Sequence, residues 1–65
     1  MSSAFPLDQW FDVSKPISRE DADIAEAQMM LYAEKDGADP MSPECTAQYR
    51  AMRQAVQAHN ARFRT

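Results

Sequence analysis

The sequence predicts an all-α protein, in which an antiparallel two-helix hairpin follows an N-terminal aromatic arm. One observation is a row of residues at alternating steps of four and three from Cys45 to Phe63, which is the spacing of a helix seam facing one partner. Another is the pair of serine N-cap positions, Ser18 and Ser42, with Gly37 between them as a helix stop. The 65 residues allow one domain at most.

Residues 1–16 are predicted to form the arm, which contains a short helical turn. Pro6 can open this turn, and Leu7, Trp10 and Phe11 then share one face at i, i+3 and i+4. Pro16 ends the segment. The arm either covers apolar surface of its own chain or presents aromatic anchors to the groove of a partner.

Residues 17–65 are predicted to form the hairpin, with a helix at 19–36, a turn at 37–42 and a helix at 43–62. Ser18 caps the first helix, and Gly37 takes the left-handed conformation that closes it. Ser42 caps the second helix, with Pro43 at its first position. A turn of six residues makes the two helices antiparallel neighbours.

The helix at 19–36 carries two apolar stripes, so we expect it to contact two neighbours. One stripe comprises Ile17, Ile24, Ala27 and Leu31, and the other comprises Ala22, Ala25, Met29 and Tyr32. One neighbour is the second helix, and the other is the arm or a second copy of the chain. We predict that the chain forms a homodimer, a four-helix bundle, with Met29 and Tyr32 at the interface.

A protein interface is predicted on the seam, the arm and the second stripe. Its members are Phe5, Leu7, Trp10, Phe11, Met29, Tyr32, Tyr49, Met52, Val56, His59 and Phe63. His59 lies on the seam, so its protonation would place a charge in packed surface, and we consider it as a pH-sensitive contact.

A polar stripe beside the seam is a possible nucleic-acid contact. The stripe comprises Arg50, Arg53, Gln57, Asn60 and Arg64, and the possible contact residues are Arg50, Arg53, Gln57 and Arg64. Residues 1–44 hold ten acids and three bases (−7), whereas residues 45–65 hold four arginines (+4), for a net charge of −3. We expect Arg50 and Arg53 to lie near Glu34 and Asp36, and Arg62 and Arg64 to lie near Glu20, Asp21 and Asp23. Pairing between the helices therefore explains the arginines without nucleic acid.

The residue types favour neither an enzyme nor a cofactor or metal site. Cys45 and His59 are the single cysteine and the single histidine, and a lone thiol without a positioned base is a weak nucleophile. The sequence contains no run of about 18 apolar residues and no basic, hydrophobic leader, so we expect no membrane contact and a cytoplasmic location.

The turn sequence Pro40-Met41-Ser42-Pro43, followed by Ala47-Gln48-Tyr49-Arg50, resembles the helical hairpin of type III secretion needle and rod subunits. That resemblance implies a subunit of a secretion or phage assembly. The chain departs from the pattern because no long hydrophobic extension follows Phe63 and because Arg53 stands where an apolar residue is expected. In architecture the chain also resembles the plasmid copy-number two-helix proteins, which dimerise and bind RNA.

The function that the sequence favours is that of a small intracellular protein–protein interaction module. Its size fits a bacterial or phage origin. Such a module acts as an adaptor, a chaperone-like partner or an accessory subunit of an assembly, without catalysis. The alternatives are a dimeric helical nucleic-acid-binding or regulatory protein that uses the arginine stripe, and the assembly subunit described above.

Overall fold

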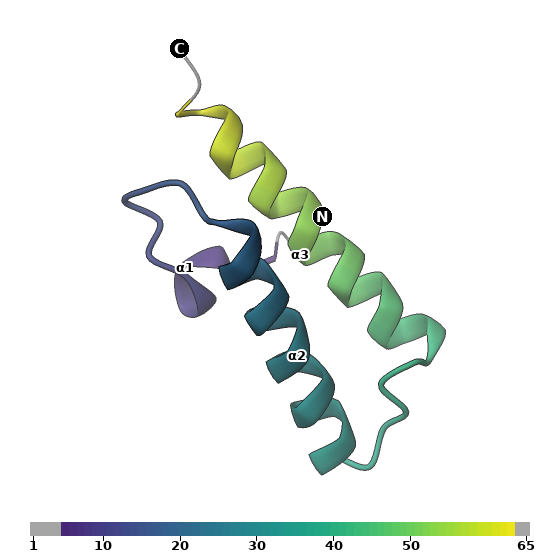
Figure 1. The fold of residues 1–65 in the computed structure, drawn as a ribbon. Coiled ribbons are helices and arrows are strands. Elements are labelled where there is room, and N and C mark those ends of the chain that lie inside the picture. Colours follow the sequence, from purple (N-terminus) through teal and green to yellow (C-terminus); the bar gives the residue numbers. More distant parts are fainter. Residues whose placement is uncertain (1–4, 64–65) are drawn as a thin grey trace.

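The computed structural model describes residues 5–63, and in this range it contains three helices and no strand. The helices are α1 (Leu7–Trp10), α2 (Arg19–Lys35) and α3 (Pro43–Ala61), so the all-α prediction is confirmed. Figure 1 shows α2 and α3 side by side, running in opposite directions, with α1 beside the first turns of α2. No helix within residues 5–63 combines the length and the apolar character needed to cross a bilayer.

The helix ends follow the local signals of the sequence. The Ser18 hydroxyl accepts a hydrogen bond from the Asp21 backbone N–H (3.1 Å), and the Ser42 hydroxyl accepts one from the Cys45 N–H (3.3 Å). Gly37 has φ +80°, which only glycine adopts without strain. The predicted caps are therefore confirmed, and α2 and α3 each end one residue earlier than expected.

The core lies between α2, α3 and the connector that precedes α2. It is formed by Ile17, Ala22, Met52 and Val56, and Met52 is completely buried. Around it pack four partly buried side chains, namely Phe5, Leu7, Phe11 and Met29. The arm is therefore folded onto its own chain, where α1 packs against α3 and Trp10 reaches Tyr32 in the second half of α2.

The register between α2 and α3 differs from the expected one. Arg53 forms ion pairs with Asp23 (2.7 Å) and Glu26 (3.0 Å), not with Glu34 or Asp36. Two antiparallel helices joined by a short turn bring together residues that are equally far from the turn. Arg53 lies three turns into α3 and so meets residues three turns before the end of α2. The expected partners were too close to the turn.

The two apolar stripes of α2 have different environments. Ala22 and Ala25 are buried, and Met29 is half-buried against the core. In the other stripe Ile17, which precedes α2, is buried in the core, whereas Ile24 and Leu31 are 51% and 64% exposed. The stripe expected at a dimer interface thus packs largely within the chain, and the opposite stripe is uncovered.

Candidate protein interaction surfaces

The aromatic side chains of the arm contact each other and α2. The Trp10 ring lies 6.2 Å from the Phe5 ring and 6.0 Å from the Tyr32 ring, the latter in an edge-to-face arrangement. Such pairs add a small specific attraction to the burial of apolar area. Of the two possibilities for the arm, the structure shows the one in which the arm covers its own chain. The side chains of Trp10 and Tyr32 nevertheless remain partly exposed to solvent.

Two polar side chains near the end of α3 bind the backbone of the connector. Asn60 accepts a hydrogen bond from the Ile17 N–H through Oδ1 (2.7 Å) and donates one from Nδ2 to the Ile17 carbonyl (2.8 Å). His59 Nε2 lies 2.9 Å from the Lys15 carbonyl oxygen. Because a carbonyl can only accept, Nε2 carries the proton in this contact. We call this set of contacts the closed end of the molecule.

The role of Asn60 was not predicted from the sequence, where it is one member of a polar row on α3. A side-chain amide can satisfy both the N–H and the carbonyl of one distant residue only when the chain folds back to meet it. The signal available in the sequence was its position beside His59, at the edge of the apolar seam.

The predicted seam of α3 is mostly buried. Tyr49, Met52, Val56 and His59 are buried, whereas Phe63 is 42% exposed and lies edge-on against the His59 ring at 5.1 Å. The neutral and the charged form of His59 can both donate from Nε2 to the Lys15 carbonyl. The pH-sensitive contact therefore stays a prediction.

A groove of about 330 Å³ opens at the other end of the helix pair, beside the turn. Trp10 of α1, Met29 and Tyr32 of α2, and Cys45 and Tyr49 of α3 line it, with Asp36 and Glu44 among its polar residues. We call it the turn groove.

The Tyr49 hydroxyl fixes the wall that α3 contributes to the turn groove. It donates a hydrogen bond to the Pro40 carbonyl (2.7 Å), which ties α3 to the turn that joins it to α2. Burial raises the pKa of the Tyr49 phenol, so the hydroxyl keeps its proton for this bond.

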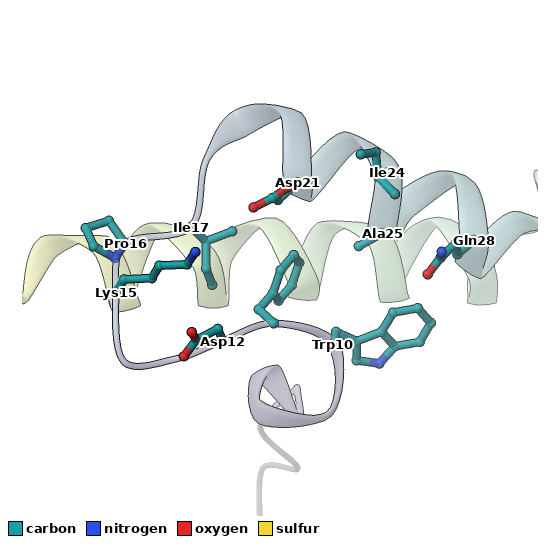
Figure 2. A pocket seen from close by; sticks show the side chains of 10 residues that line it. Trp10, Asp12, Lys15, Pro16, Ile17, Asp21, Ile24, Ala25 and Gln28 are labelled. Carbon is teal, nitrogen blue, oxygen red and sulfur yellow. The ribbon is translucent and has the colours of Figure 1, made fainter.

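A second pocket, of about 300 Å³, lies between α2 and the segment that joins it to α1 (Figure 2). Figure 2 shows Trp10 and Gln28 at one end and Asp12 and Lys15 at the other. Hydrogen bonds from the side chain and the backbone of Ser14 hold the pKa of Asp12 below its ordinary value. Charges of both signs line this pocket, so it shows no preference for a ligand of one charge.

The proposed nucleic-acid stripe is not a row of unpaired cations. Arg53 is bound to two carboxylates, and these hydrogen bonds raise its pKa above the ordinary value. Arg50 and Gln57 are exposed, and Arg64 lies outside the described residues. The charge left for phosphate contacts is therefore smaller than the sequence suggests.

The thiol and the imidazole are not neighbours. Cys45 is half-buried in the first turns of α3, and His59 lies fourteen residues further along the same helix, a rise of about 21 Å. A pair for nucleophilic catalysis needs hydrogen-bond reach, which this separation does not give.

Comparison of the chain with protein-family models, with curated proteins and with solved structures finds no match. The functional argument therefore depends on the geometry of the surfaces described above.

Proposed function

We propose that the protein is a non-catalytic protein–protein interaction module whose unit is an antiparallel two-helix hairpin with a folded arm. In this proposal, two copies associate through the outer face of α2 and form a four-helix arrangement. The observation that carries the proposal is the uncovered apolar stripe of α2, which is complementary to itself when two copies meet in opposite directions.

An acidic, an apolar and a basic part follow one another along the outer face of α2. Glu20, Ile24, Ala27, Leu31 and Lys35 follow one another at steps of four, three, four and four, so they share one side of the helix. All five are exposed. The face thus begins with an acid, ends with a base and is apolar between them.

A two-fold axis between Ala27 and Gln28 would make this face its own partner. Ile24 of one copy would then pack against Leu31 of the second copy, and Glu20 would face Lys35 of the second copy. The small side chain of Ala27 at the centre allows the two helix backbones to approach. An isologous interface requires this kind of self-complementarity.

Met29 is not placed at this interface, because it packs against the core. Tyr32 is 57% exposed, but it lies on the side of α2 that faces Trp10. The proposed dimer therefore uses the stripe opposite to the one that the sequence suggested, and the turn groove and the arm stay accessible for other proteins. An adaptor or an accessory subunit of an assembly needs both kinds of surface.

The test is sedimentation velocity over a wide concentration range, for the wild type and five variants. A contact limited to one helix face is small, so we expect a dissociation constant of about micromolar or weaker. Leu31→Glu would abolish the dimer, because it buries an unpaired charge in the apolar centre. Gln54→Glu, at an exposed position of α3, is the matched control and would leave the dimer intact.

Charge exchange tests the direction of pairing. Glu20→Lys or Lys35→Glu alone would weaken the dimer, and the double exchange would restore it, since opposite charges meet again. A wild type that stays monomeric at all concentrations, or a dimer that Leu31→Glu leaves unchanged, contradicts the proposal.

A further inference from the structure

We propose that the turn groove is a binding site for an arginine side chain presented by another protein. The site goes beyond self-association, because its walls lie on the side of α2 that faces α1 and α3. It rests on the proposed function only in that the protein acts by binding other proteins.

The walls of the turn groove provide aromatic surface for a flat cation. Trp10 and Tyr32 meet edge to face, with ring centres 6.0 Å apart, so the two rings present surfaces in different directions. Tyr32 is more than half exposed, which leaves its ring available to a ligand. Attraction between a cation and an aromatic face is strongest for tryptophan.

The charged side chains of the groove have one sign. Asp36 and Glu44 line it, and within residues 5–63 no arginine or lysine does so. Asp36 caps the C-terminus of α2, and Glu44 is in the first turn of α3. The dipoles of these two helix ends have opposite signs here, so the two carboxylates decide that the groove favours a cation.

The combination of rings and carboxylates selects arginine among cationic side chains. The guanidinium group is planar and weakly hydrated, so it stacks on an aromatic ring and at the same time donates two parallel hydrogen bonds to a carboxylate. An ammonium group is compact and strongly hydrated, and it fits an apolar wall less well. Met29 and Tyr49 provide apolar contacts for the methylene stem.

Trp10 is the single tryptophan of the chain, so its fluorescence reports on the groove directly. The probe is the peptide acetyl-Ala-Leu-Arg-Leu-Ala-amide, and the control is the same peptide with citrulline, the neutral isostere of arginine. Titrations are run at a protein concentration at which sedimentation shows a monomer. We expect the arginine peptide to bind at least about fivefold more tightly than the citrulline peptide, with a difference that shrinks at high salt.

Variants locate the binding site. Glu44→Gln and Asp36→Asn would each weaken binding of the arginine peptide by about two- to fivefold and leave binding of the citrulline peptide unchanged. Glu34→Gln is the control, because Glu34 is an exposed acid of α2 that belongs neither to the groove nor to the outer face. Circular dichroism verifies that each variant is folded.

Three outcomes would overturn the proposal. They are equal affinity for the two peptides, an equal loss in Glu34→Gln and Glu44→Gln, and amide chemical-shift changes, measured by NMR, that miss Tyr32, Cys45 and Tyr49. Loss of wild-type self-association on Arg62→Gln would assign the groove to a second copy and would also contradict a separate protein partner. The outer-face dimer is tested by other variants, so the two proposals can fail independently.

Discussion

The two ends of the helix pair are built differently. At the closed end, Asn60 and His59 bind the connector backbone, and Ile17, Met52 and Val56 are buried beneath it. At the turn end, the space between α2 and α3 stays open as a groove with aromatic walls. The difference shows that the two ends use their side chains differently: polar contacts and a small apolar core stabilise the closed end, whereas Tyr32 at the turn end stays mostly exposed.

The largest expected effect is the loss of folding stability when a buried apolar side chain is removed, compared with an exposed one at the groove. Met52→Ala removes a completely buried side chain and would lower the free energy of unfolding by about 2–4 kcal/mol. Tyr32→Ala, at the groove, would change it by less than about 1 kcal/mol, because that side chain is already mostly in water. Urea unfolding followed by circular dichroism measures both. Similar losses in the two variants would remove the distinction between the ends.

The next effect concerns the contacts of Asn60. Asn60→Ala leaves the N–H and the carbonyl of Ile17 without their partner in a partly buried place, at a cost of about 2 kcal/mol. Gln57→Ala, one turn earlier and exposed, is the control and would be nearly neutral. Hydrogen exchange would show faster exchange of the Ile17 amide in the first variant alone. Unchanged protection at Ile17 would contradict the described contact.

The smallest effect concerns the two N-caps, one at each end. Ser18→Ala and Ser42→Ala would each cost about 1 kcal/mol, because a cap acts on its own helix turn and not on the tertiary contacts beyond it. Thermal unfolding of both variants would show similar shifts. A much larger loss at one serine would mean that this cap also supports the packing of its end.

The parts of the fold that depend on neighbours in sequence could be predicted from it. Ser18, Ser42 and Gly37 mark helix ends through their own side chains or backbone freedom, and the spacing from Tyr49 to His59 marks a buried helix face. The candidate sites depend on distant segments. The position of the arm decides whether Met29 or Leu31 faces the core and whether Trp10 reaches Tyr32. No local sequence pattern predicts that position.

The sequence by itself determined the helices, their caps and the face of α3 that is buried, because these features arise from hydrogen bonds and side-chain periodicity within a few residues. Only the tertiary structure decided the register of Arg53 against Asp23 and Glu26, the binding of the connector by Asn60, and the choice of the stripe of α2 that is left uncovered. The physical reason is that α2 has apolar residues on two sides, so its pattern is compatible with either orientation. The arm, by packing over one side, leaves the other to solvent.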